Sequence, residues 1–309
     1  MKYVKHFAAL IVILIALTSI CLGETGAAKD ISGQVAKLKV TAPPEEVVKK
    51  LNLDEFYKKH VDLDGFSIIS SEKVDDHALL EAAYLIKQIL QNRGDILKKL
   101  AENKVRFAIM AHDEFTTDVP EHSDMKPAKF WNRRARGLGP SKKRPVVSCG
   151  EENLLCFDGD PYTQENLLIH EFAHAIHHMG INHIDDEFDN KLKAAYDDAM
   201  KNGLWKDKYA ATNRAEYWAE AVQSYFDDNR LPDHDHNHVN TRKELFEYDP
   251  ALANLIKEQL GDIKWKYKKL ADRKKKEKRH LAGYDESKKP KFAWPKEYSN
   301  WDKVKKQFK

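Results

Sequence analysis

The chain has 309 residues, of which 42% are hydrophobic, and this composition excludes a disordered protein and provides for a core in one large or two small domains. No repeat of solenoid period is present. Charge is uneven, because residues 264–309 hold 18 Lys and Arg against 6 Asp and Glu. This segment carries +12 and the rest −9, so we separate 263–309 as a basic, Lys-rich C-terminal extension.

The N-terminus has the order of a signal peptide. Lys2 and Lys5 precede an apolar run at 7–17, and small and polar residues follow. The run is shorter than the roughly 18 to 20 residues that a membrane-spanning helix needs, which disfavours the alternative of an uncleaved anchor. We expect 1–23 to be a signal peptide cleaved near Gly23, leaving a secreted, extracellular protein that is not integral to a membrane.

The predicted elements begin after a polar segment at 24–50, which we interpret as a linker or mobile arm before a catalytic domain at 51–262. Apolar residues recur at helical spacing over 74–100, so the N-terminal part of the domain is helical to about residue 100. Short apolar runs at 105–110 and 145–148 predict strands. Between them, the Arg- and Gly-rich stretch 131–140 is typical of a surface loop.

Three later helices are expected. Asp160 as cap and Pro161 at the first helical position indicate a helix start ahead of the apolar residues from Leu167 onward. Further helices are predicted over 186–200 and over 212–226, the second from a Thr212 cap through Phe226.

The first of these helices contains the pentapeptide HEFAH at 170–174. Residues four apart lie on one helix face, so His170 and His174 can bind one zinc ion, and Glu171 beside it can act as the general base toward water. The alternative is an amphipathic helix with surface histidines, but Ala173 and its apolar neighbours favour a buried helix.

A third ligand is required. The metzincin pattern would place a histidine at Gly180, so that class is disfavoured. In the segment AEYWAEA, Glu216 and Glu220 lie four apart on one face of an otherwise apolar helix, so one can bind zinc while the other accepts the free N–H of a ligating histidine. Three more histidines near the motif are interpreted as surface or orienting groups: His177, His178 and His183.

The two motifs together resemble the gluzincin metallopeptidases, and more narrowly the group similar to anthrax lethal factor and the Pro-Pro endopeptidases. This resemblance implies that Glu216 is the third zinc ligand, which leaves Glu220 as the group that supports a ligating histidine. It also implies that Tyr209, seven residues before Glu216, stabilises the transition state. A broader likeness is to secreted or bacterial proteins that combine this zinc helix with the stretches RGLG at 136–139 and GEEN at 150–153. We expect a strand near 146–148 to be the sheet edge that binds an extended peptide.

Some features remain open in the sequence. Cys149 and Cys156 form a disulfide or remain two free thiols. The alternating His234, His236 and His238 indicate a solvated loop or an auxiliary metal site. A second polar cluster is interpreted as a surface turn, and it consists of Asp118, Glu121 and His122. The aromatic and Lys-rich extension fits an anionic surface or polymer, with nucleic acid disfavoured by secretion, or a solvated tail.

These observations predict an α+β fold: a zincin-like catalytic core with a small mixed sheet packed on the HExxH helix, predominantly helical overall. The predicted function is a secreted zinc metalloendopeptidase with one Zn²⁺ per chain and a peptide or protein substrate. The alternatives are a zinc hydrolase acting on a non-peptide bond and a non-catalytic zinc-binding interaction protein. A purely structural zinc site needs no base, so Glu171 argues against the second alternative.

Overall fold

The computed structural model describes residues 29–298, so the predicted signal peptide at 1–23 lies outside the described residues. The five strands are β1 Lys59–Leu63, β2 Phe66–Ser70, β3 Arg106–Met110, β4 Gly137–Leu138 and β5 Val146–Gly150. The α-helices are α1 Ile31–Val35, α2 Glu45–Leu51, α3 Asp76–Ile89, α4 Gly94–Glu102, α5 Ala128–Arg134, α6 Glu151–Leu154, α7 Leu167–Ala175, α8 Phe188–Lys201, α9 Arg214–Tyr225, α10 Arg242–Tyr248 and α11 Pro250–Leu260. Helices and strands therefore mix as the sequence predicts, and the α+β fold class is confirmed.

The strands form one mixed sheet in the order β1-β2-β3-β5-β4. β2, β3 and β5 run parallel, while β1 and β4 pair antiparallel to β2 and β5 respectively. The predicted strands 105–110 and 145–148 correspond to β3 and β5. However, β5 is interior, so the expectation that 146–148 forms the edge is wrong. The edge beyond β5 is the two-residue strand β4, within a stretch predicted as a loop.

Each face of the sheet buries its own set of apolar side chains. Phe107, Ile109 and Val147 pack into the large core shared with helices α3, α4 and α7, whereas Ala108 and Val146 point to a smaller cluster beside α2. This alternation is what a sheet covered on both faces requires. The predicted helix over 74–100 is confirmed as α3 and α4, and its break falls before α4 begins at Gly94.

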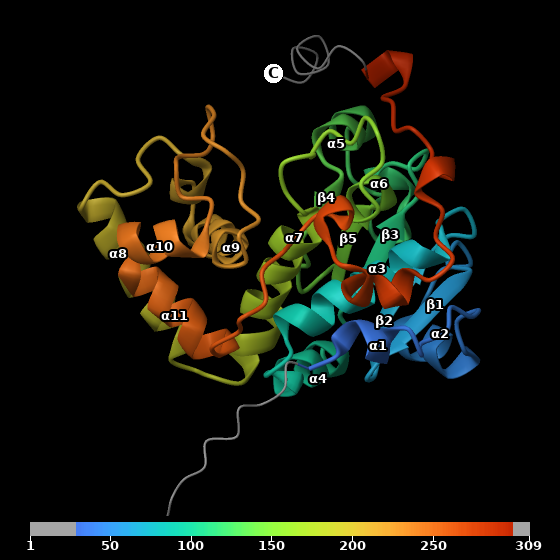
Figure 1. Cartoon of the computed structure of the whole chain (residues 1–309), viewed down its shortest axis with the longest axis horizontal. Helices are drawn as coiled ribbons and strands as arrows, with labels where there is room; N and C mark the ends of the chain where they lie inside the picture. The colour runs from blue at the N-terminus through green and yellow to red at the C-terminus, as the bar shows by residue number, and fades with distance from the viewer. Residues whose placement is uncertain (1–28, 299–309) are drawn as a thin grey trace, which may run out of the picture. The chain divides into compact units, whose positions relative to one another are not determined.

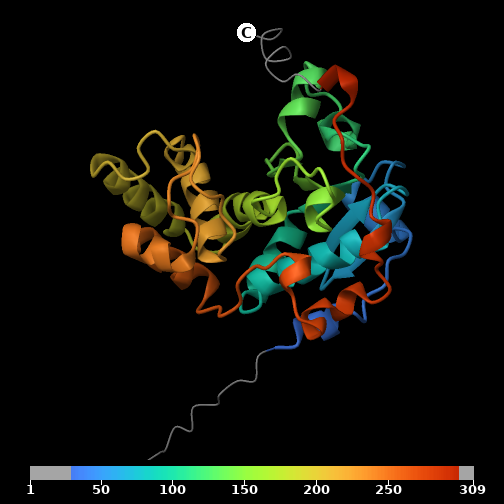
Figure 2. The ribbon, with the colours of Figure 1, turned by 45° about the horizontal axis from the view of Figure 1, so that its top comes forward.

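Helix α7 carries the HEFAH pentapeptide and packs against both the sheet and α9 (Figure 1). Helices α8 to α11 lie on the other side of α7 from the sheet, and the turned view in Figure 2 shows the same arrangement. The predicted helix 186–200 is confirmed as α8. The α9 prediction is one residue off, because Asn213 rather than Thr212 caps the helix.

The segment 24–50 differs from the expected linker or mobile arm over its described part. It contains α1 and α2, and Ile31 and Val35 of α1 are buried against α3 and the C-terminal segment. These two apolar residues lie four apart, so one face of a single short helix turn is enough to bury both.

The described part of the C-terminal extension, 263–298, is also packed rather than a solvated tail. It runs along α3 and ends beside α5 (Figures 1 and 2). It buries apolar side chains that the lysine-rich composition conceals: Ile263, Leu270, Leu281 and Phe292. Arg273 and His280 bond Glu81 of α3, with Arg273 Nη1 at 2.9 Å and His280 Nε2 at 2.8 Å, and the pair holds the pKa of Glu81 at about 2 against the opposing effect of burial. A domain boundary at 262 would therefore remove part of the core.

Three further findings concern local structure. Among residues 29–298, no helix has the length and apolar character needed to cross a membrane. Cys149 and Cys156 are free thiols. The predicted helix start at Asp160 and Pro161 is wrong, because turns occupy this segment and α7 begins only at Leu167; the Asp160 carboxylate instead accepts bonds from Tyr162 N and from the Asn153 amide.

Candidate metal centre

The start of α7 is fixed by the GEEN stretch. Asn153 Oδ1 accepts a hydrogen bond of 2.7 Å from Leu167 N, which satisfies an amide that has no partner within the helix. Asn153 Nδ2 in turn donates to Glu165 O at 2.9 Å. Farther along, Trp218 Nε1 of α9 donates 3.0 Å to Ala173 O. These bonds fix α7 along its axis and against α9.

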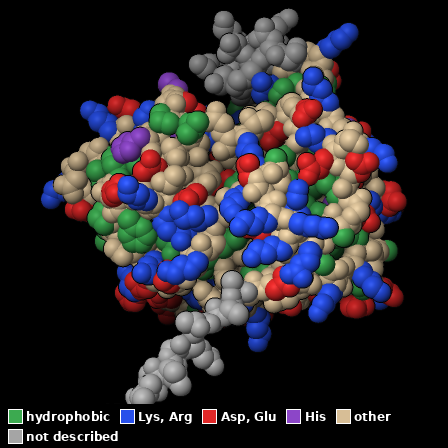
Figure 3. Space-filling view, viewed as in Figure 1, with side chains coloured by type: hydrophobic (Ala, Val, Ile, Leu, Met, Phe, Trp, Pro, Cys, Tyr) green, Lys and Arg blue, Asp and Glu red, His purple; other side chains and the backbone are tan. Residues whose placement is uncertain are grey.

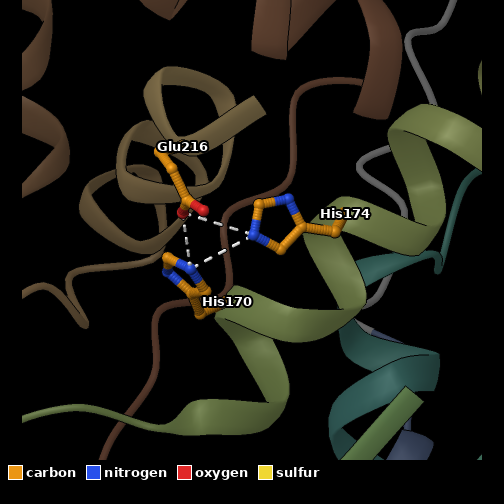
Figure 4. A group of neighbouring side chains, drawn as sticks. All are labelled: His170, His174 and Glu216. Carbon is orange, nitrogen blue, oxygen red and sulfur yellow. Dashed lines mark hydrogen bonds and ion pairs between the residues drawn. The ribbon is translucent and has the colours of Figure 1, made fainter. Parts of the chain in front are cut away.

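Three side chains from α7 and α9 converge on one point (Figure 4). His170 Nε2 lies 3.2 Å from Glu216 Oε2, His174 Nε2 lies 3.4 Å from the same oxygen, and the two imidazole nitrogens are 3.3 Å apart. Asn213 caps α9 by accepting bonds from the backbone N–H of Ala215 and Glu216, which places Glu216 in the first turn, facing α7. The structure thus brings together the three predicted ligands.

This triangle fits zinc. With bonds of about 2.0–2.1 Å, two ligands of a tetrahedral zinc ion lie about 3.3–3.4 Å apart, close to the three separations observed. Two imidazoles and a carboxylate are also a common donor set for a catalytic zinc, and they leave one position of the tetrahedron for water or substrate. Within residues 29–298 no other group of His, Cys, Asp and Glu side chains is placed to hold a metal.

The electrostatics of the three groups suit a cation. Burial alone would raise the pKa of Glu216, but hydrogen bonds from His170 and His174 outweigh it and hold that pKa well below its usual range. Glu216 is therefore a carboxylate at neutral pH and can act as an anionic ligand. Burial also raises the pKa of the neighbouring Glu171 carboxyl, against the opposing charges of the two histidines.

The residue that orients His170 was missed in the sequence. Gln223 Oε1 lies 2.8 Å from His170 Nδ1, whereas Glu220 Oε1, the predicted supporting group, lies 3.5 Å from the same nitrogen. Gln223 Nε2 donates 3.0 Å to Glu165 Oε2, which leaves Oε1 as the acceptor toward the imidazole. Gln223 lies seven residues after Glu216, two turns farther along the same face of α9, and this spacing is the signal that could have revealed it.

Tyr209 lies next to the metal-binding atoms. Its ring centroid is 6.3 Å from that of His170, and both residues line a pocket of about 290 Å³ together with Glu171. Burial, with the charge of Glu216, raises the pKa of Tyr209, so its phenol carries a proton at neutral pH and can donate a hydrogen bond into the pocket.

The RGLG stretch places the sheet edge directly on the candidate site. A Cβ added to Gly137 would lie 3.1 Å from Glu171 Cγ, and one added to Gly139 would lie 2.9 Å from His174 Cβ. Only glycine lets strand β4 approach α7 this closely. The two glycines thus set the width of the space between the free edge of the sheet and the candidate catalytic residues.

Arg136 holds this strand in place, although its stretch was predicted to be a surface loop. The guanidinium is fully buried and bonds both oxygens of Glu152, at 2.6 and 3.0 Å, as well as the carbonyl oxygens of Ala111 and Glu114. A side chain at Gly150 would collide with the Glu152 carboxylate. The RGLG and GEEN stretches are therefore two halves of one buried contact.

The remaining histidines divide between support and surface. His177 is buried and bonds Asp189 at 3.0 Å, and burial lowers its pKa to about 3, while His178 stacks on it. His236, expected in a solvated loop, is buried at 7% exposure and lines the pocket, whereas the His234 side chain is 97% exposed.

The polar cluster predicted as a surface turn is also partly buried. Glu121 accepts bonds from Arg106 and Tyr57, and His122 is buried next to Ser148. This cluster therefore supports β3 and β5 from the face opposite α7.

Comparison with known proteins places these residues in a family. No curated protein sequence matches the chain. A solved structure, the Pro-Pro endopeptidase PPEP-2 from Paenibacillus alvei, is similar at 20% identity over 63% of this chain and 97% of that chain, with a TM-score of 0.38, which is too low to bear on the fold or the site. The family model described as anthrax toxin lethal factor, N- and C-terminal domain, matches residues 68–242, more than half of the chain and all of the converging side chains. The resemblance predicted from the two motifs is confirmed, and the chain belongs to the anthrax lethal factor family.

Proposed function

We propose that this protein is a zinc-dependent metalloendopeptidase. The observation that carries the proposal is the position of Glu171. It lies on the same helix as His170 and His174, and it faces the pocket lined also by Tyr209. A metal-binding triad alone is compatible with a structural site, but a carboxylate and a phenol in one pocket beside it supply a base and a donor.

The chain's own residues have separate roles in this mechanism. His170, His174 and Glu216 would hold the zinc ion, which would supply Lewis-acid polarisation of the scissile carbonyl and a lowered pKa of water. Glu171 accepts the proton of the attacking water and passes it to the leaving amine. Tyr209 donates a hydrogen bond to the oxygen that gains negative charge in the tetrahedral transition state, and this bond is strongest there.

A peptide backbone is the substrate that the free edge of β4 suits. Edge strands offer unpaired N–H and C=O groups to an extended chain. Because Gly137 packs closely on Glu171, a chain paired along β4 would lie beside the proposed base, and this supports a peptide substrate. This geometry favours a peptide over the alternative of a non-peptide bond.

The test is cleavage of a peptide library by the purified, zinc-loaded full chain, read by mass spectrometry. Cleavage is expected to stop on chelation and to return when zinc is added. Glu216→Ala should lose both zinc and cleavage, because two imidazoles alone leave the ion under-coordinated. Unchanged zinc affinity in Glu216→Ala would place the third ligand elsewhere, and zinc binding without any cleavage would favour a non-catalytic zinc protein.

Secretion and an anionic partner are further parts of the proposal. The signal-like order of residues 1–23 supports export. Many Lys and Arg side chains gather on the face seen in Figure 3, interspersed with acidic ones. In the C-terminal segment, Lys274, Lys275 and Lys276 form an exposed run. We expect binding to vesicles that contain anionic lipid to weaken as salt rises and when these three lysines become Gln. Vesicle binding that responds neither to salt nor to the loss of the three lysines would contradict an anionic partner.

A further inference from the structure

The loop formed by residues 233–238, which we name the 233–238 loop, contacts the candidate site at two separate points. Its side chains looked like a solvated polar run in the sequence, yet Asp235 and His236 line the pocket that contains Glu171. Asp235 and His236 are not among the three predicted zinc ligands, so their contribution to the site must be indirect.

The first contact fixes Tyr209. Its backbone N–H donates 2.8 Å to Asp235 O, and the preceding Lys208 donates through Nζ to Asp233 O at 3.0 Å and His234 O at 3.2 Å. Tyr209 begins the short 3-10 turn Tyr209–Ala211, which follows an extended residue, so these three bonds determine where the phenol enters the pocket.

The second contact approaches His170 through Glu220, which lies near the same ring nitrogen that Gln223 bonds at 2.8 Å. His236 Nε2 lies 3.4 Å from Glu220 Oε2, and Glu220 Oε1 lies 3.5 Å from His170 Nδ1. Asn229 Nδ2 donates 3.1 Å to the same Oε2. Glu220 and His236 are both nearly inaccessible to solvent, so a lost partner here would not be replaced easily by bulk water.

Asp233 makes the loop rigid between these two contacts. Its Oδ1 accepts from Asp235 N and His236 N, both at 2.8 Å, and lies 2.9 Å from His236 Nδ1. Its other oxygen pairs with Arg230 at 2.5 Å. The Asp233 carboxylate thus fixes both Asp235, whose carbonyl oxygen bonds Tyr209 N, and His236, whose imidazole contacts Glu220.

We propose that the 233–238 loop positions both the phenol of Tyr209 and the zinc ligand His170. The positioning residues are His236 in the loop and Lys208, which bonds the loop from the segment before Tyr209. This inference rests on the proposed function for its Tyr209 half. The His170 half concerns zinc affinity alone and stands independently of any peptide cleavage.

Two amide substitutions test the His236 half by measuring the zinc dissociation constant through competition with a chelator. In H236N the amide can replace Nδ1 toward Asp233 but cannot reach Glu220, whereas in H236Q the longer side chain can reach it. We expect H236N to weaken zinc binding by about tenfold or more, the lower end for loss of a group that supports a ligand, and H236Q to restore most of it. H234N is the matched control, because the exposed imidazole of His234 bonds only its neighbour Asp235, and its zinc affinity should equal that of wild type. Equal zinc affinity in H236N and wild type would overturn this half.

Lys208→Met tests the Tyr209 half. It removes two bonds to the loop and no atom from the pocket lining, so kcat should fall about tenfold while KM and zinc affinity stay unchanged. In a Tyr209→Phe background the same substitution should have almost no further effect, because the donor it positions is already absent. A loss of kcat that is equally large in both backgrounds would overturn this half of the inference.

The two halves also separate this inference from the proposed function. If the wild-type protein binds zinc but cuts no peptide, the proposed function fails, and the chelator competition still decides the His236 half. If H236N fails to show a cooperative melt, Glu220→Gln carries the His236 half, because it keeps the size of the side chain but removes the carboxylate that His236 Nε2 contacts. Zinc binding should then weaken, and unchanged affinity would overturn this half, while Lys208→Met still tests the Tyr209 half. If wild type cuts peptide and neither half responds, the coupling is absent although the function stands.

Discussion

Glu171→Gln is expected to reduce kcat for peptide cleavage by at least about 10²-fold while zinc remains bound, because the amide keeps the size of the side chain but cannot accept a proton. Zinc content should not change, since Glu171 lies beside the ligand triangle and is not part of it. The measurement is kcat on one peptide, with zinc determined in each preparation.

Two variants calibrate this result. Tyr209→Phe should lose about 10²- to 10³-fold in kcat if its donor is well placed, with zinc again retained. Glu45→Gln, which changes an exposed carboxylate on α2 that bonds only Lys49, should behave as wild type. Full activity of zinc-loaded Glu171→Gln would refute the mechanism, and another catalytic centre would have to be sought.

Arg136→Met is expected to lower the free energy of unfolding by about 3–5 kcal/mol, because it leaves the fully buried carboxylate of Glu152 without its cation. β4 should also lose its attachment, so the residual folded protein should cleave peptide more slowly. Chemical denaturation measured with tryptophan fluorescence, at saturating zinc and without zinc, gives the stability difference.

Controls for this substitution are available in the same chain. Arg144→Met removes an exposed pair in which Nη2 bonds both oxygens of Asp124, and it should cost no more than about 1 kcal/mol. Adding Glu152→Leu to Arg136→Met should recover part of the loss, because the unpaired charge disappears. If Arg136→Met is no more destabilising than Arg144→Met, the buried pair does not hold the edge strand.

The sequence predicted those features that depend on spacing along one helix or strand. His170 and His174, four residues apart, and the period of α3 need no tertiary information. The helices predicted over 74–100, 186–200 and 212–226 were placed within a few residues, whereas the start of α7 was predicted six residues too early. The hairpin β1-β2 was missed although Asp64 and Gly65 mark it, and both adopt the positive φ of a two-residue turn, 53° and 89°.

The rest depended on contacts between distant segments. In the sequence Arg136 resembles a surface residue and His236 a solvated one. Their burial follows only from the contacts of Arg136 with Glu152 and of His236 with Glu220. Polar residues of this kind have no apolar period that would indicate burial, so their composition predicts a loop. The same holds for the C-terminal extension, where a few widely spaced apolar side chains hold a lysine-rich segment on the core.

The ion pair of Glu81 also sets an order of events during synthesis. Its two partners follow 192 and 199 residues later, and His280 further bonds Ser32 across 248 residues. Contacts of such long separation form slowly because the loop between them must first be closed. Until Arg273 has been translated, Glu81 is a carboxylate in an apolar helix face without a cation, so burying α3 is costly. Since α7 packs on α3, we expect the metal-binding side chains of α7 and α9 to come together only after Arg273 and His280 are available.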